Sequence, residues 1–318
     1  MLLEQSLTSK LGALYVLGSY NVDIVSEVKD FPKVGETIRA TSTTFYSGGK
    51  GTNQATAAAK VSNNVHFCTK VGSDSFASRA KKHLQSTQLA SLSLYQHRSV
   101  STGNAFIMLS EQTRDNMITL DLGANLTLTE QEVASEASKL ESSNVLLVQL
   151  ENNLSAISQT LQQAKQHQVL TILNPAPYSH HVSQLIQWID VITPNETEAQ
   201  SLTNIEVIDI ESAEQAAKCI YSMGPKLVVI TLGSKGCLVY DGSEFKRYLS
   251  YSSNVVDTCG AGDSFNGALA ASLSNGVSVK DSINYANAFA SLAVERKGAS
   301  SMPEDKDVHE RMTQQFSL

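Results

Sequence analysis

The chain has 318 residues, of which 42% are hydrophobic and 17% are charged, and its formal net charge at pH 7 is −7. This composition is ordinary for a globular protein and excludes collagen-like, disulfide-scaffold and wholly disordered classes. The acidic total argues against a nucleic-acid-binding protein, because phosphate-backbone binding needs a concentrated field of Lys and Arg. At roughly one domain per 150 residues, the length allows two domains or one large domain with an appendage.

The spacing of the cysteines and the length of the apolar runs indicate the cellular compartment of the protein. The four cysteines stand far apart without a Cys-x-x-Cys pair, which argues against a zinc knuckle or a disulfide framework and favours a reducing environment. The first six residues lack the basic and apolar regions of a signal peptide, and no run reaches the roughly 18 apolar residues of a membrane span. We therefore expect a cytoplasmic protein with neither an export signal nor a membrane anchor.

Short β-branched runs alternate with helical periodicity along most of the chain, which is typical of βαβ units and a mostly parallel sheet. The expected strands cover residues 13–18, 65–71, 145–150, 169–173, 189–193 and 226–232. Near the C-terminus, apolar residues recur every three or four positions from Val279 to Val294. This spacing predicts a core-facing helix, and we expect Gly298 to end it.

Two segments, 22–47 and 104–121, break this alternation. Together they carry Thr, Ile, Phe and Met in strand-like order, with no convincing crossover helix. A small sheet is stable only when one of its faces is covered. We therefore expect these segments to form extra strands that serve as a lid or an interface.

Polar residues follow the first predicted strand, where Asn21 and Asp23 end the string Gly18-Ser19-Tyr20-Asn21-Val22-Asp23. Ligands of open α/β sheets bind beyond the carboxyl ends of the strands, so both side chains are well placed, although Asn and Asp are also ordinary turn formers. The string Gly48-Gly49-Lys50-Gly51-Thr52-Asn53-Gln54 precedes an Ala-rich stretch. Its glycines permit close approach of a ligand, and Lys50 and Asn53 could bind the hydroxyls of a polyol. The alternative is a flexible connection with a solvated Lys50.

Three further polar strings follow predicted strands. Glu151 comes directly after one of them and could bind a ligand or cap the next helix. Asn195 and Glu198, three residues apart at a predicted helix start, could bind Mg²⁺ through its waters or only complement the helix dipole. The run Thr231-Leu232-Gly233-Ser234-Lys235-Gly236 could be a simple hairpin turn.

The strongest local signal is Asp257-Thr258-Cys259-Gly260-Ala261-Gly262-Asp263, a glycine-rich turn that we expect between a short strand and an Ala-rich helix. Backbone N–H groups at a helix N-terminus attract anions. Asp263 then lies in the first turn, where it either caps the helix or serves as the carboxylate near an attacking hydroxyl in phosphoryl transfer. The glycines on both sides of Ala261 favour phosphoryl transfer, since a plain cap needs no exposed backbone.

Two standard nucleotide fingerprints are absent. Phe265 stands where a dinucleotide fingerprint has its third glycine, which disfavours a hydride-transfer enzyme. Lys50 is followed by Gly51 rather than by the Ser or Thr of a P-loop, and Thr44 replaces that motif's first glycine.

Taken together, the strings resemble the ribokinase-like family of sugar and nucleoside kinases, in order from about Gly18 to Pro303. The matching motifs are Gly-Gly-Lys-Gly-x-Asn-Gln at 48–54, Asn-Pro-Ala-Pro at 174–177, Pro-Asn-Glu-Thr-Glu at 194–198, Asp-Thr-x-Gly-Ala-Gly-Asp at 257–263 and Arg-Lys-Gly-Ala at 296–299. The resemblance implies a single α/β domain over residues 1–318. It would have a three-layer core with a mostly parallel sheet and a small β-sheet lid, whose strands come from about 22–47 and 104–121.

The resemblance also implies the activity, which is ATP-dependent phosphorylation of D-ribose at its 5-hydroxyl. Asp263 would be the general base, and the backbone amides of Gly260, Ala261, Gly262 and Asp263 would hold the developing charge. The residues implied to bind the pentose under the lid are Asn21, Asp23, Gly48, Gly49, Lys50, Asn53, Glu151 and Asp263.

Nucleotide, metal and partner assignments follow from the same resemblance. The residues implied for ATP are Asn195, Thr231, Leu232, Gly233, Ser234, Lys235, Gly236, Gly262 and Asn287. Mg²⁺ would lie near Asn195 and Glu198, held through water. The residues implied for K⁺ are Asp257, Cys259, Ala293, Arg296, Gly298 and Ser301, with Cys259 in place of the threonine common in the family. Lids of two subunits would pack together in a homodimer.

Several alternatives stay open at this point. Within the same class, deoxyribose or a nucleoside could be the acceptor; an Asn21 amide that bonds the 2-hydroxyl favours ribose, because a deoxy-sugar leaves it partly unpaired. A sugar-binding sensor without turnover would keep the same fold, although intact Asp263, Gly260, Gly262 and Lys50 argue against it. We expect neither a nucleic-acid nor a membrane partner.

Overall fold

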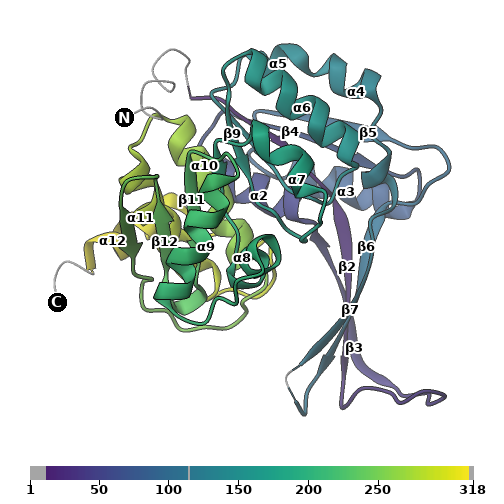
Figure 1. Ribbon diagram of the computed structural model, residues 1–318. Helices are drawn as coiled ribbons and strands as arrows, with labels where there is room; N and C mark the ends of the chain where they lie inside the picture. Colours follow the sequence, from purple (N-terminus) through teal and green to yellow (C-terminus); the bar gives the residue numbers. More distant parts are fainter. Residues whose placement is uncertain (1–11, 114, 315–318) are drawn as a thin grey trace.

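The computed structural model describes residues 12–113 and 115–314, which form a large α/β core and a small sheet that projects from it (Figure 1). The first six residues, in which we expect no export signal, lie outside the described part. None of the helices in the described ranges combines the length and the apolar character that a bilayer crossing requires.

The core sheet of the described residues has nine strands in the order β13-β12-β11-β10-β9-β8-β1-β4-β5. Its pairs are parallel except for β11–β12 and β12–β13. Each strand expected in the core is confirmed, most of them shorter by a residue or more. The bounds are β1 Leu14–Leu17, β4 Val65–Val71, β5 Ser91–Gln96, β8 Val145–Val148, β9 Leu170–Leu173, β10 Val191–Ile192, β11 Leu227–Thr231, β12 Cys237–Tyr240 and β13 Phe245–Tyr248.

Helices cover both faces of this sheet. Alternate strand residues such as Leu14 and Leu147 pack with α2, α3, α10, α11 and α12 on one face, because side chains of a strand alternate in direction. Tyr15 and Leu146 pack with α4 to α9 on the other face. The expected three-layer α/β core is therefore confirmed. The helices are α2 Lys50–Ala59, α3 Ser75–Gln85, α4 Glu130–Ser135, α5 Ala137–Glu141, α6 Leu154–Gln166, α7 Val182–Leu185, α8 Glu196–Thr203, α9 Ile210–Ser222, α10 Ala261–Ser274, α11 Val279–Ala293 and α12 Asp305–Gln314.

The projecting sheet, which we call the lid, is built from the two segments that broke the alternation. Its order is β3-β2-β6-β7, with β2 and β6 parallel and the outer pairs antiparallel. Figure 1 shows the strands leaving the core as a twisted ribbon. The bounds are β2 Asn21–Val28, β3 Ala40–Gly48, β6 Gly103–Ser110 and β7 Asn116–Asp121. The prediction of extra strands at 22–47 and 104–121 is confirmed.

Two local expectations are wrong. No strand precedes the glycine-rich turn, since residues 249–260 have no regular structure between β13 and α10. The helix predicted near the C-terminus ends at Ala293 rather than at Gly298, because Asp257 and Val256 donate their backbone N–H groups to the Val294 carbonyl and turn the chain away. The hairpin reading of 231–236 is confirmed, as the short helix η3 (Gly233–Lys235) joins the antiparallel strands β11 and β12.

Candidate active site

Asp263 lies in the first turn of α10 and does not cap that helix. Gly260 is the N-cap residue, with φ 78°, a left-handed conformation that favours glycine. The Asp263 carboxylate instead accepts hydrogen bonds from Asn53 Nδ2 at 3.0 Å and from Gln54 Nε2 at 2.9 Å. The carboxylate is 7% exposed and fixed at both oxygens by α2. The capping alternative is therefore wrong, and the orientation suits a group that accepts a proton.

The glycines around Lys50 allow α2 to begin directly over the end of β1. A Cβ atom on Gly51 would lie 2.4 Å from the Gly18 backbone, and one on Gly48 would lie 2.1 Å from Asp23 Oδ2. Gly49 has φ 91°, again left-handed. The structure places Lys50 at the start of α2, facing the carboxylates, so the alternative of a flexible connection with a solvated lysine is wrong.

Asn21 and Asp23 open the lid strand β2, and Glu151 lies beside them from the end of β8. Glu151 Oε2 accepts a hydrogen bond from the Lys50 backbone N–H at 3.0 Å, lies 3.5 Å from Asn21 Nδ2, and accepts the Ser19 hydroxyl. Glu151 does not cap α6, whose N-cap residue is Asn153. Three residues that the family resemblance implies for the pentose, Asn21, Asp23 and Glu151, thus lie together at one edge of the sheet.

Buried carboxylates dominate the electrostatics of this region. Burial, with the neighbouring Glu151 and Asp263 carboxylates, raises the pKa of Asp23 to about 7. Burial also raises the pKa of Glu151. The Asp263 carboxylate raises the pKa of Lys50, although burial acts in the opposite direction. Lys50 is therefore held as a cation among carboxylates, where it can attract a further anion.

The raised pKa of Asp23 gives a test by pH. The unfolded carboxyl titrates near pH 4 and the folded one near 7, so the folded state binds more protons between these values and stability falls as the pH rises through them. We expect Asp23→Asn to be more stable than the wild type at pH 8, with a gain that vanishes toward pH 4. Urea titrations across this range measure it. Asp115→Asn, an exposed lid position, is the control and should show no such gain.

A cavity of about 170 Å³ adjoins Asp263 at the N-terminus of α10. Its lining residues are Lys50, Asn174, Ala176, Thr193, Asn195, Glu198, Thr231, Thr258, Gly260, Ala261, Gly262, Asp263 and Asn266. Of the residues expected to bind a nucleotide, Asn195, Thr231 and Gly262 line this cavity. Leu232 is buried and Gly233 to Gly236 form the hairpin connection. Asn287 is also buried and donates to Cys237 Sγ at 3.7 Å, so the structure does not bring it to the cavity wall.

Asn195 and Glu198 form a capping box at the start of α8. Asn195 Oδ1 accepts from the Glu198 backbone N–H at 2.8 Å, and Glu198 Oε2 accepts from the Asn195 N–H at 2.9 Å. The alternative in which they serve the helix terminus is thus confirmed. Both also line the cavity, where burial raises the pKa of Glu198. The side-chain oxygens of Asn195 and Glu198 are nevertheless of the type that binds Mg²⁺ through its water ligands.

Asp257 ties the residues expected around K⁺ into one loop. Its carboxylate accepts the backbone N–H groups of Cys259 and Gly298, both at 2.9 Å. The Ala293 carbonyl accepts from Arg296 N–H and the Gly298 carbonyl from Ser301 N–H. Within the described ranges, no cluster of three or more His, Cys, Asp or Glu side chains could hold a metal ion.

Several residues that order the site were not predicted from the sequence. Gln54 holds Asp263, Asn174 accepts from Gln54 Nε2 at 3.0 Å, and Ser19 donates to Glu151. Ser300 donates to Asn53 Oδ1 at 2.8 Å and to the Ser47 carbonyl at 2.9 Å. Gln54 is the one with a local signal, since it directly follows Asn53 in the glycine-rich string. The others come from distant parts of the chain.

An α/β core with a projecting small sheet, and a carboxylate in the first turn of α10 beside a polar cavity, together fit a carbohydrate kinase. Residues 13–306 match the description "pfkB family carbohydrate kinase", and the chain belongs to this family. The resemblance to the ribokinase-like family is thereby confirmed.

Individual relatives are similar over nearly the whole chain. A ribokinase of Haemophilus influenzae is 38% identical over 91% of this chain and 94% of its own. The crystal structure of Thermotoga maritima ribokinase has a TM-score of 0.85 at 32% identity, covering 95% of this chain and 99% of that one. Arabidopsis thaliana ribokinase, complexed with ribose and ATP, has a TM-score of 0.84 at 31% identity with the same coverage.

Proposed function

We propose that this protein transfers the γ-phosphoryl group of ATP to the 5-hydroxyl of D-ribose. The observation that carries the proposal is the orientation of Asp263, whose two oxygens are held by Asn53 and Gln54 at the N-terminus of α10. The similarity to ribokinases, one of them complexed with ribose and ATP, supports the choice of substrates.

The proposed roles follow from position. Asp263 accepts the proton of the 5-hydroxyl as that oxygen bonds to the γ-phosphorus, and the bond to the β-phosphate oxygen breaks to release ADP. The backbone N–H groups of Gly260, Ala261, Gly262 and Asp263 stabilise the negative charge that develops on the phosphoryl oxygens. Lys50, half-buried among carboxylates, lies on the cavity wall beside Asp263 and adds positive charge there.

The sugar and the nucleotide would approach Asp263 from two sides. We assign the pentose to Asn21, Asp23, Lys50, Asn53 and Glu151, with Gly48 and Gly49 allowing close contact. The cavity beside α10 takes the phosphates, and the hairpin connection from Thr231 to Gly236 lies on the way to the adenine. Asn287 is assigned to this region only by resemblance to the family.

Two cations complete the proposal. The oxygens of Asn195 and Glu198 suit Mg²⁺ held through water, and Mg²⁺ would neutralise charge on the phosphates of the nucleotide. The carboxylate of Asp257 and the carbonyls of Cys259, Ala293, Arg296 and Gly298, with Ser301 nearby, offer the oxygen donors that K⁺ takes. Since Asp257 already orders the loop that leads into Gly260, a cation there would stiffen the anion-binding turn.

We also propose the cytoplasm as the site of the reaction. The four cysteines of the described residues are free thiols, and such thiols persist in a reducing compartment. Fractionation of cells that express the full chain would test this assignment.

One experiment tests the reaction itself. An assay coupled to ADP formation is run on ribose, 2-deoxyribose, hexoses and nucleosides, with and without K⁺, and the product is analysed for a 5-phosphate. We expect the highest kcat/KM with ribose. A higher kcat/KM with 2-deoxyribose or a nucleoside would overturn the proposed acceptor, and absence of ADP formation with every acceptor would overturn the kinase.

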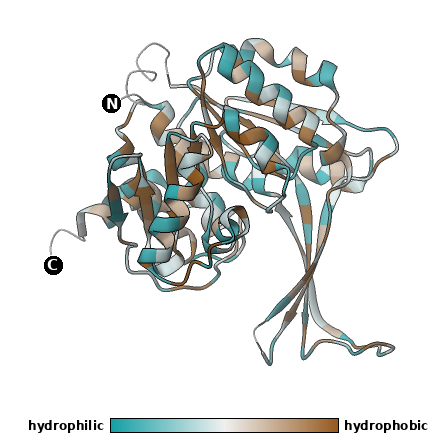
Figure 2. Cartoon of the chain, in the orientation of Figure 1, coloured by the Kyte–Doolittle hydropathy of each residue, from teal (hydrophilic) through white to brown (hydrophobic). Residues whose placement is uncertain are grey.

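We further propose that the lid pairs with the lid of a second subunit. Asn21 and Asp23 lie on the same face of the lid as Ile118 and Leu120, as the strand register shows. Ile118 is 57% exposed and Leu120 is 39% exposed, and Figure 2 shows hydrophobic positions along the projecting strands. An apolar face of this kind on a small sheet needs a cover, and an isologous contact with a second lid supplies one.

Charge on this face should separate the subunits. We expect Ile118→Asp to be monomeric in sedimentation velocity at a concentration where the wild type is a dimer, because burying an unpaired carboxylate is costly. Thr119→Asp lies on the opposite face beside Phe106, which is 56% exposed, so it distinguishes the two faces of the lid and should stay dimeric if the Ile118 face forms the contact. A monomeric wild type, or an Ile118→Asp variant that remains a dimer, would contradict the proposed contact.

A further inference from the structure

The turn η1 (Gly123–Thr127), where the chain returns from the lid to the core, carries a fully buried asparagine. Asn125 is 0% exposed and bonds to the segment that contains Asn21. Its Oδ1 accepts the Tyr20 backbone N–H at 3.0 Å. Its Nδ2 lies 3.0 Å from the Tyr20 carbonyl and 2.9 Å from the Leu122 carbonyl. These partners fix which end of the Asn125 amide is nitrogen, because the N–H faces Oδ1 and both carbonyls face Nδ2.

The fixed Asn125 amide in turn orients Asn21. Asn125 Nδ2 lies 2.9 Å from Asn21 Oδ1, so the Asn21 oxygen is the atom that faces Asn125. Asn21 Nδ2 consequently points the other way, toward Glu151 Oε2 at 3.5 Å. In this orientation Asn21 presents only N–H donors to the proposed sugar site, beside a carboxylate that only accepts. A hydroxyl at this place can accept from the amide and donate to the carboxylate.

The neighbourhood is built to keep these two amides together. A Cβ atom on Gly103 would lie 2.2 Å from Asn21 Oδ1 and 2.3 Å from Asn125 Nδ2, so any side chain there would separate them. Residues that follow Glu151 also hold the turn, since Asn152 Nδ2 donates to the Asn125 carbonyl at 3.2 Å. Asn153 bonds both the N–H and the carbonyl of Leu128.

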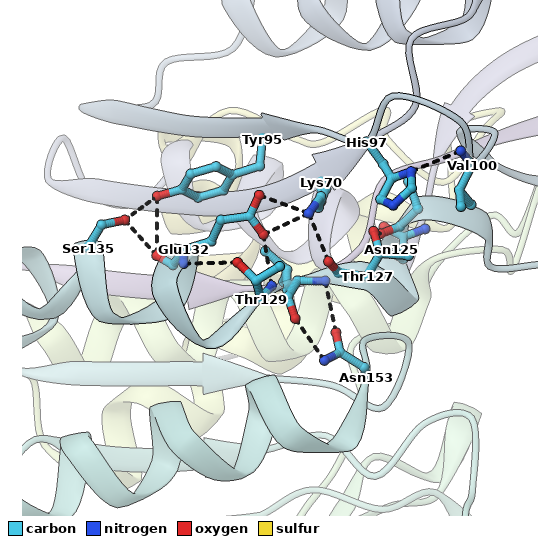
Figure 3. A network of polar contacts seen from close by, with 12 residues as sticks. Lys70, Tyr95, His97, Val100, Asn125, Thr127, Thr129, Glu132, Ser135 and Asn153 are labelled. Atoms are coloured by element: carbon cyan, nitrogen blue, oxygen red, sulfur yellow. Dashed lines mark hydrogen bonds and ion pairs between the residues drawn. The ribbon is translucent and has the colours of Figure 1, made fainter.

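A buried ion pair closes the turn from the other side. Lys70 Nζ donates to the Thr127 carbonyl at 2.8 Å and pairs with both oxygens of Glu132, and Figure 3 shows these contacts near Asn125 and Asn153. Lys70 is 3% exposed, so this support is shielded from water. The turn is therefore held by β4 and by the loop that follows β8, next to Asn21.

We propose that Asn125 is a positioning residue for sugar selectivity, which fixes the Asn21 amide with its N–H groups toward the sugar. This inference rests on the proposed function. A pentose hydroxyl that accepts from Asn21 gains from the fixed amide, whereas a deoxy-sugar that lacks the hydroxyl gains nothing from it. The role therefore predicts a change in discrimination between ribose and 2-deoxyribose, beyond any general loss of activity.

The variant Asn125→Asp tests this prediction. Its new carboxylate would place an oxygen against Asn21 Oδ1 and two carbonyls, so the Asn21 amide should turn its oxygen toward the sugar. We expect the ratio of kcat/KM for ribose to that for 2-deoxyribose to fall by about tenfold, the worth of one hydrogen bond. The change should lie mainly in KM for ribose, because Asn21 does not bind the reacting hydroxyl. Asn125→Ala, which frees the Asn21 amide, is used if the aspartate variant does not fold.

Asn153→Ala is the matched control, because Asn153 bonds the same turn but does not contact Asn21. Asn153→Ala should change the ratio of kcat/KM for ribose to that for 2-deoxyribose by less than twofold, even if it lowers the melting temperature. A double-mutant cycle with Asn21→Ala adds a second criterion: the Asn125 effect on the ratio should vanish when Asn21 is already truncated.

Three results would overturn the inference. They are an equal loss for both sugars in the Asn125 variants, the same shift of the ratio in Asn153→Ala, or an Asn125 effect that persists in Asn21→Ala. A wild type that does not phosphorylate ribose would overturn the proposed function and this inference with it. A wild type that does so, with variants of unchanged selectivity, would overturn the inference alone.

Discussion

Replacing the Asp263 carboxylate by an amide should abolish most phosphoryl transfer while leaving ribose binding in place. In Asp263→Asn the side chain keeps its size but cannot accept the proton of the 5-hydroxyl. A positioned general base contributes about 10²- to 10⁴-fold, so we expect kcat to fall by that amount. The affinity for ribose, measured by calorimetry without ATP, should change only a few-fold, because most groups assigned to the sugar are untouched.

Asp281→Asn is the matched control, since Asp281 is also an acidic residue in the first turn of a helix but serves the N-terminus of α11. It should keep the wild-type kcat and lose about 0.5 kcal/mol of stability at most. An Asp263→Asn enzyme with full activity would remove Asp263 as the base. Intact ribose binding with no turnover in the wild type itself would instead favour a sugar sensor.

The second large effect concerns the crossing of α2 and α10. A Cβ atom on Gly267 would lie 2.2 Å from the Gln54 backbone oxygen and 2.7 Å from Ala57 Cβ. In Gly267→Ala the two helices must move apart, and overpacking of this kind costs about 1–3 kcal/mol or more. Because Gln54 also holds the Asp263 carboxylate, we expect a lower free energy of unfolding together with a reduced kcat. Urea titration and steady-state kinetics measure the two effects.

Gly262→Ala is the control that distinguishes steric crowding between the helices from the general effect of replacing a helical glycine by alanine. Gly262 lies in the same helix, and a Cβ atom there would meet no other atom within 4 Å. Alanine is the better helix former, so this control should leave stability unchanged or raise it by up to about 1 kcal/mol. If both variants lost the same stability, close packing of α2 against α10 would not be the reason.

The core and the lid could be predicted because their signals are local. Apolar runs alternate with helical periodicity in the core, and the lid segments stand out by lacking a crossover helix. The place of Asp263 in the first turn of α10 was also predictable, since glycines on either side of Ala261 mark a helix N-terminus. The ends of helices and strands were less predictable. Helix α11 ends at Ala293 because the backbone N–H groups of Val256 and Asp257, about forty residues away in sequence, donate to the Val294 carbonyl.

The residues that orient the site had no comparable signal. Gln54 and Asp263, or Asn125 and Asn21, are more than a hundred residues apart, and their hydrogen bonds exist only once the sheet has formed. Asn195 and Glu198 show the opposite case. Their spacing fitted a cation site or a helix terminus equally well, and in the structure they make the capping box. A local hydrogen-bonding pattern therefore identifies a helix start more securely than it identifies a ligand.

The lid joins the core at the ends of β2 and β3 that carry residues assigned to the sugar. Asn21 is the first residue of β2 and Gly48 the last of β3, so the groups assigned to the sugar lie at the root of the lid rather than at its tip. Glu151, by contrast, follows the core strand β8. Because Asn21 and Asp23 lie near the pivot of any swing of the lid, such a motion would displace the tip of the lid much further than these two residues. An opening lid would then uncover the groups assigned to the sugar while leaving them assembled, because Asn125 keeps Asn21 bonded to the core.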